Sequence, residues 1–127
     1  MRSIKSLEEM NIPPQYRNFI SAYLQNISGI SYISSVILFG SCAKEAVKEN
    51  SDIDIFVTVD RDISLDEEFL ISYYLLPEHA DDQISTDIIV QPESTFRQYM
   101  NTTCTLQKQV NHFGVDLSGL ISKCPRD

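Results

Sequence analysis

Residues 38 to 57 (LFGSCAKEAVKENSDIDIFV) constrain the fold more than any other segment, because they place a tight turn between two apolar stretches. Residues 36 to 39 form a short apolar run that predicts a buried strand, and Gly40 marks the point where the backbone turns. Ser41 follows as the predicted N-cap of a helix. The unpaired N–H groups at the start of such a helix favour phosphate oxygens. A side chain at position 40 would obstruct the close approach of the backbone, so replacing Gly40 with a larger residue is expected to weaken nucleotide binding more than folding.

The second apolar stretch, residues 51 to 59, carries two carboxylates on one face. Side chains alternate along a strand, so Asp52 and Asp54 share one side while the isoleucines and valines take the other. Neighbouring carboxylates repel each other unless a cation lies between them, and Mg²⁺ takes carboxylate oxygens together with substrate phosphates. We therefore predict a metal site here. The alternative is the solvent face of an edge strand.

A third carboxylate, Asp87, is the only acidic residue in the β-rich run from Ser85 to Gln91. Pro92 closes this run. If this strand pairs beside Asp54, Asp87 completes a cluster of three carboxylates. Such a cluster can hold one or two metal ions and take a proton from an attacking hydroxyl group. A cap at the start of a strand is the alternative role for Asp87.

The order of these features is similar to that of the nucleotidyltransferases of the DNA polymerase β superfamily. The shared pattern is an apolar strand, Gly-Ser, ten residues (42 to 51), Asp-x-Asp, and a later strand with a third Asp. Within the superfamily the chain looks most like the stand-alone minimal nucleotidyltransferases, in which a Gly-Val-x-Leu segment often follows the last helix, as Gly114-Val-Asp-Leu117 does here. The resemblance implies an α/β (α+β) nucleotidyltransferase fold, a small mixed sheet flanked by helices.

The resemblance also implies site residues and a cofactor. Gly40 and Ser41 match the phosphate-binding turn, and Lys44 keeps a cation there. The implied catalytic and metal-binding residues, with Mg²⁺ as cofactor in a one- or two-metal site, are Asp52, Asp54 and Asp87.

The turn departs from the Gly-Ser-Arg-Ala-Arg-Gly that relatives often carry. Lys44 lacks the forked guanidinium that suits phosphate, and Cys42 has no charge. Glu45 adds an acidic group and a β-carbon where glycine is usual. We therefore expect transfer that is slow or depends on the right partner.

Length and composition predict one globular domain over residues 1–127. With 43% hydrophobic residues, the chain still has no apolar run near the roughly 18 residues of a membrane span. The polar N-terminal segment lacks a signal-peptide pattern, which predicts a cytoplasmic protein. Three cysteines without metal-ligand spacing fit reduced thiols: Cys42, Cys104 and Cys124.

The formal net charge of −8 argues against a nucleic-acid substrate. Only Arg61 offsets the acidic residues between Asp60 and Asp87, which are Asp60, Asp62, Asp66, Glu67, Glu68, Glu78, Asp81, Asp82 and Asp87. A protein surface or a cationic small molecule suits this charge better as acceptor.

Three helices are expected from apolar spacing and capping residues. The first begins at Pro13-Pro14 and ends at Ser28-Gly29. The second follows the capping box Ser64-x-x-Glu67 and ends before Pro77. The third runs from Glu93 to about His112 with Gly114 as C-cap. Arg97, near its start, is interpreted as a surface residue that would reach a phosphate only if this helix lay close to the carboxylates.

Two functional hypotheses remain open from the sequence. In the first, the chain transfers a nucleoside monophosphate, specifically AMP from ATP, to a hydroxyl group. The resemblance implies an all-helical HEPN protein as its partner in a toxin–antitoxin pair. In the second, it is a weak or inactive nucleotide-binding subunit that masks such a partner. Transfer to an aminoglycoside-type antibiotic is disfavoured, because the chain lacks a further helical domain for the acceptor pocket unless a homo-oligomer supplies it.

Overall fold

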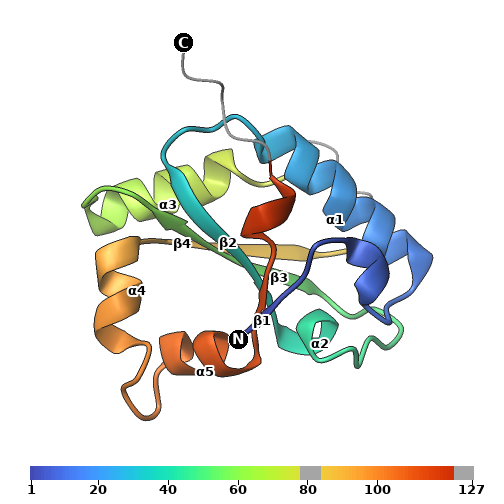
Figure 1. Cartoon of the computed structure of the whole chain (residues 1–127). Helices are drawn as coiled ribbons and strands as arrows, with labels where there is room; N and C mark the ends of the chain where they lie inside the picture. The colour runs from blue at the N-terminus through green and yellow to red at the C-terminus, as the bar shows by residue number, and fades with distance from the viewer. Residues whose placement is uncertain (78–83, 122–127) are drawn as a thin grey trace.

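One mixed five-stranded sheet forms the centre of the computed structural model, which describes residues 1–77 and 84–121 (Figure 1). The strands are β1 (Arg2–Ser3), β2 (Ile33–Phe39), β3 (Ile53–Val59), β4 (Thr86–Pro92) and β5 (Val115–Asp116). They lie in the order β1-β5-β2-β3-β4 across the sheet. Strand β3 is antiparallel to β2 and parallel to β4, so the predicted mixed-sheet α/β fold class is confirmed.

Helices cover both faces of this sheet. They are α1 (Pro14–Ile27), α2 (Gly40–Ala43), α3 (Leu65–Tyr74), α4 (Glu93–Tyr99) and α5 (Leu106–Phe113), with short 3-10 helices at Leu7–Glu9 and Ser118–Leu120. Figure 1 shows α1 and α3 on one side of the sheet and α4 and α5 on the other. None of the helices among the described residues has the length and apolar character needed to cross a membrane.

The alternation predicted for β3 decides which core each residue joins. Ile53, Ile55 and Val57 are buried in the large core that also contains the inner face of α1. Phe56 points to the opposite face and packs in a smaller core with Ile37, Phe96 and Val110. Because Asp54 and Phe56 are two residues apart, Asp54 lies on the face of α4 and α5.

The predicted first helix is confirmed as α1. Pro14 occupies its first turn, and its apolar residues at three- and four-residue spacing are buried, namely Tyr16, Ile20, Tyr23, Leu24 and Ile27. The predicted second helix is confirmed as α3, since the Ser64 side chain accepts from the Glu67 N–H and Glu67 accepts from the Ser64 N–H. Three large apolar residues of α3, namely Leu65, Phe69 and Tyr73, are nevertheless exposed.

The prediction of one continuous helix from Glu93 to His112 is wrong, because the structure has two helices there. Helix α4 ends at Tyr99, and Thr105 caps a new helix by accepting from the Lys108 N–H. Between them Cys104 has a φ of 66°, a left-handed conformation that no helix continues through. Gly114 does cap α5, and a β-carbon there would lie 2.3 Å from the Val110 carbonyl oxygen.

Candidate active site

Two of the predicted carboxylates lie side by side on parallel strands. Asp54 of β3 is in register with Asp87 of β4, and both point to the face of α4 and α5. The pKa of Asp54 is raised from 3.8 to about 6, chiefly by burial, and also by the negative charges of Asp87 and Asp52 and a side-chain hydrogen bond with Asp87. The structure thus brings together negative charge that favours either a proton or a cation.

The Gly-Ser turn packs directly against Asp54. Phe39, the last residue of β2, is in register with Asp54, and Gly40 follows with a φ of +74°. A β-carbon on Gly40 would lie only 2.2 Å from Asp54 Oδ2. A larger residue here would collide with Asp54 and would adopt the left-handed φ at a cost, so we expect it to destabilise the fold as well as disturb the site.

Asp52 completes the expected trio in sequence but stands apart in the structure. It precedes β3, and its side chain is exposed, although its charge still acts on Asp54. Within residues 1–77 and 84–121, no three His, Cys, Asp or Glu side chains form a group that could hold a metal ion as they stand. The Asp54–Asp87 pair has the hard oxygen donors that suit Mg²⁺, and the charge of Asp52 adds to the negative potential at Asp54.

Ser41 is not the N-cap that the sequence predicts. Helix α2 begins one residue earlier, at Gly40, its N-cap is Phe39, and no side chain caps it. With only four residues this helix makes one turn, so its dipole is small. Any phosphate at this turn would therefore depend on individual N–H groups and on the Ser41 hydroxyl.

Cys42 is a structural residue that sequence reasoning left without a role. Its side chain is fully buried, and the thiol donates to the Asp52 carbonyl oxygen at 3.7 Å. Burial raises the pKa of Cys42 to about 11, so the group is a neutral thiol at physiological pH. The contact ties the turn to the segment that carries Asp52 and Asp54. The sequence feature that could have indicated this structural role is the small, uncharged side chain of Cys42 at a position where relatives often have arginine.

Lys44 lies at the C-terminal end of α2 with its ammonium group over an aromatic ring. The distance from Lys44 Nζ to the centre of the Phe113 ring is 4.8 Å. Such an exposed cation–π contact contributes about 0.5–1 kcal/mol, whereas a hydrogen bond to a charged group contributes about 1.5–3 kcal/mol. A phosphate within reach would therefore draw Lys44 away from Phe113.

Glu45 does not act as a free negative charge beside the turn. Its carboxylate accepts a hydrogen bond from the Asn11 N–H and forms an ion pair with Arg2 at 3.3 Å. Its φ is +56°, in the left-handed region that glycine adopts without strain. The structure thus explains why glycine suits this position and shows that the glutamate here fastens the N-terminal segment.

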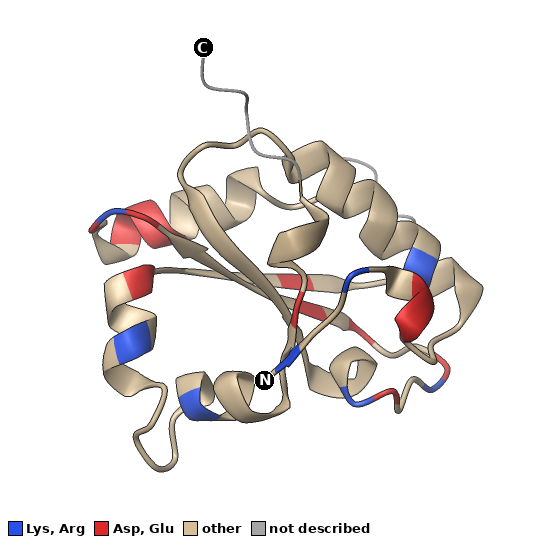
Figure 2. Cartoon of the chain, viewed as in Figure 1, with Lys and Arg blue, Asp and Glu red and all other residues tan. Residues whose placement is uncertain are grey.

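Acidic residues lie at the site and on α3. Figure 2 shows them on the first turn of α3 and on strands β3 and β4. Glu78, Asp81 and Asp82, which contribute to the predicted acidic run, lie outside the described residues, as do His79 and Cys124. A cavity of about 1000 Å³ lies elsewhere, beside the start of α1, and its described lining includes Tyr16, Phe19 and Ile84 but none of the predicted site residues.

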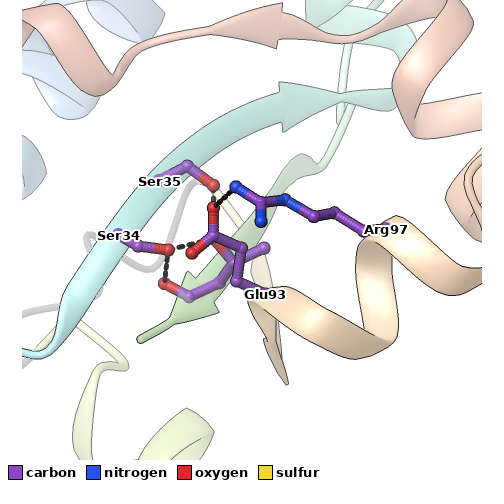
Figure 3. Close-up of polar contacts among 5 residues, drawn as sticks. Ser34, Ser35, Glu93 and Arg97 are labelled. Atoms are coloured by element: carbon purple, nitrogen blue, oxygen red, sulfur yellow. Dashed lines mark hydrogen bonds and ion pairs between the residues drawn. The ribbon is translucent and has the colours of Figure 1, made fainter. Parts of the chain in front are cut away.

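Arg97 lies at the opposite end of β3 from Asp54. Helix α4 begins directly after Pro92, which is in register with Val59 at the far end of β3, about 17 Å from Asp54 at 3.3 Å per residue. Arg97 forms an ion pair with Glu93 at 2.5 Å, and Figure 3 shows the two side chains together beside the β2 serines, Ser34 and Ser35. Arg97 is therefore a surface residue remote from the carboxylates.

Comparison with known protein families agrees with this geometry. No curated protein and no solved structure shows a significant match to the chain. The family model described as "Polymerase beta, Nucleotidyltransferase" matches residues 18–110, which run from α1 through β2, the turn, β3 and β4 to α5. Members of this family typically use Mg²⁺ and act on nucleotides. On this match, which spans Gly40, Asp54 and Asp87, the chain belongs to the polymerase beta nucleotidyltransferase family.

Proposed function

We propose that this chain is a Mg²⁺-dependent nucleotidyltransferase that transfers AMP from ATP to a hydroxyl group of a partner protein. The observation that supports this most is the pairing of Asp54 and Asp87 in register beside Gly40, whose missing side chain lets the turn approach the carboxylates. In the reaction, the acceptor oxygen forms a bond to the α-phosphorus as the bond between the α-phosphorus and the bridging oxygen breaks. Pyrophosphate leaves, and the hydroxyl proton passes to a carboxylate or to water.

Each residue at the site has a proposed role. Asp52, Asp54 and Asp87 would hold Mg²⁺, and Asp87, the exposed member of the pair, is our proposed acceptor of the proton. Gly40, Ser41 and Lys44 would hold the triphosphate through backbone N–H groups, a hydroxyl and an ammonium group. When bound, the metal supplies positive charge that offsets the charge developing on the phosphate oxygens, in a one- or two-metal site.

We further propose that residues 1–127 work as a single minimal nucleotidyltransferase domain, in the cytoplasm, with an all-helical HEPN-type protein as acceptor. In this arrangement transfer would inactivate or mask the partner, as an antitoxin does. A purely binding role, in which the chain masks its partner without transfer, has separate support in the large apolar surface of α3. The two roles differ in whether AMP becomes covalently attached.

The experiment is a transfer assay with Mg²⁺, ATP labelled at the α-phosphate and a candidate HEPN-type protein. We expect label on the acceptor and release of pyrophosphate with the parent protein, and neither with Asp87→Asn. Asp62→Asn is the matched control, because this exposed residue lies beyond the other end of β3. Binding of Mg²⁺-ATP, measured by calorimetry without acceptor, separates loss of the nucleotide site from a wrong acceptor. An Asp87→Asn variant as active as the parent would refute the proposed roles.

A further inference from the structure

Among the described residues, the large apolar side chains with the highest exposed fractions lie on helix α3. Leu65, Phe69, Leu70, Tyr73 and Tyr74 each have between 69% and 77% of their surface accessible to solvent. Every other large apolar side chain described is at most half exposed. We call these five residues the α3 surface.

The outward face of α3 is more apolar than the face that packs on the sheet. Only Leu75, just after the helix, is buried, with Ile71 partly buried against the same core. Helix α1 has the usual arrangement, with its buried face made of Tyr16, Ile20 and Leu24. A soluble monomer rarely leaves a large apolar helix face uncovered, so α3 has the character of a helix at an interface.

The size of the α3 surface fits the centre of a protein interface. An aromatic side chain can bury about 150–250 Å², so three rings that are about three-quarters exposed present roughly 450 Å². The largest apolar patch on a typical monomer is about 300–600 Å² in all, and the two leucines enlarge this patch further. A standard interface buries about 800 Å² on each partner, so this patch with its polar border is sufficient.

The undescribed segments have no large apolar side chains to cover this surface. Residues 78–83 read Glu-His-Ala-Asp-Asp-Gln, and residues 122–127 read Ser-Lys-Cys-Pro-Arg-Asp. Neither of these segments therefore supplies an apolar occupant for the α3 surface.

The charges around the α3 surface indicate the kind of partner. Asp66, Glu67 and Glu68 form the first turn, and α3 contains no lysine or arginine. The nearby Arg61 already pairs with Asp60 at 2.8 Å and lies over the Tyr32 ring. A second copy docked through its own α3 surface would bring the same acidic helix, which has no lysine or arginine to pair with these carboxylates.

We propose that the α3 surface docks a different protein, one that offers an apolar groove or helix stripe bordered by lysine and arginine. The apolar side chains would provide the buried centre, and Asp66 and Glu67 would meet the basic border. Helix α3 lies on the opposite side of the sheet from α4 and α5, whose face carries Asp54 and Asp87 (Figure 1). Docking therefore leaves the carboxylates accessible, and the proposal does not depend on transfer activity.

The test uses a labelled synthetic amphipathic helix of leucine and lysine as probe, with fluorescence anisotropy as readout. A peptide of the same composition in scrambled order, without an apolar face, is the control for simple charge attraction. We expect the patterned peptide to bind more tightly than the scrambled one, and more weakly in 1 M salt, where the Debye length is about 3 Å. Phe69→Ser with Tyr73→Ser should weaken binding about tenfold or more, because buried aromatic residues dominate interface affinity.

The matched control for Tyr73→Ser is Tyr99→Ser, which makes the same substitution on a different helix. Tyr99 lies on α4 and is only 39% exposed. It should leave peptide affinity unchanged, and all variants should keep the parent's melting temperature. Equal affinity for both peptides, or unchanged affinity in the Phe69/Tyr73 variant, would overturn the proposal. So would a dimer of the parent that this variant dissociates in analytical ultracentrifugation, which would assign the surface to a second copy. Binding to phosphatidylcholine vesicles that the variant abolishes would assign it to a membrane.

Discussion

Replacing Asp54 with asparagine tests how strongly the site accumulates negative charge. The pKa of Asp54 rises from 3.8 to about 6 on folding, chiefly through burial and then through Asp87 and Asp52. For a fully buried group this difference corresponds to about 3 kcal/mol. Because the carboxyl group is only half-buried and solvent screens the charges, we expect about 1–1.5 kcal/mol.

The sign follows from proton binding. The native state holds the Asp54 proton more tightly than the unfolded chain, so between pH 4 and 6 it binds more protons, and the free energy of unfolding falls as pH rises. Asparagine has no proton to lose. Without metal, Asp54→Asn should therefore match the parent near pH 4 and exceed its stability by about 1–1.5 kcal/mol at pH 7.

The measurement is urea unfolding of the parent and Asp54→Asn between pH 4 and 8 in EDTA. Glu49→Gln removes one exposed charge in the loop before β3 and serves as control for the loss of a charge alone. Adding Mg²⁺ should stabilise the parent, by about 2.7 kcal/mol at a hundred times the Kd, and not Asp54→Asn. A constant difference between parent and variant across the pH range would refute the reasoning, because Asp54 would then titrate normally.

Three further predictions concern the turn and the core. Gly40→Ala should lower the free energy of unfolding by about 2 kcal/mol. The left-handed φ of +74° alone costs alanine about 1–2 kcal/mol, and the added carbon collides with Asp54. An unchanged midpoint of urea unfolding would show that the turn rearranges freely. Tyr23→Phe should stabilise the fold by about 1 kcal/mol, since the buried hydroxyl has no hydrogen-bond partner among the described residues; thermal unfolding that shows a loss instead would reveal a partner such as water. The double variant Lys44→Arg with Glu45→Gly should raise the transfer rate. A guanidinium binds phosphate with two hydrogen bonds, and glycine adopts the left-handed φ of residue 45 without strain. Equal rates in the labelled-ATP assay would exclude this turn from phosphate binding.

The sequence by itself determined the local features. The alternation of Asp54 with isoleucine and valine predicted a strand with one acidic face, and the Ser64 capping box predicted the start of α3. The Gly-Ser turn and the Asp-x-Asp spacing indicated the nucleotidyltransferase family that the family match shows. These predictions succeed because periodicity, capping and turns depend on residues close together in the chain.

Only the tertiary structure decided the relations between distant segments. The structure sets Asp54 beside Asp87, and it brings Gly40 so close to Asp54 that a β-carbon would not fit between them. Both relations depend on how three separate segments of the chain pack. The capping box and apolar spacing predicted α3 but could not say which of its sides the sheet would cover. Apolar spacing also predicted one helix where the chain forms α4 and α5, because the left-handed conformation of Cys104 leaves no signal in the pattern. Contacts between distant residues carry no local periodicity, so neither the carboxylate pair nor the exposed α3 surface could be located until the chain was folded.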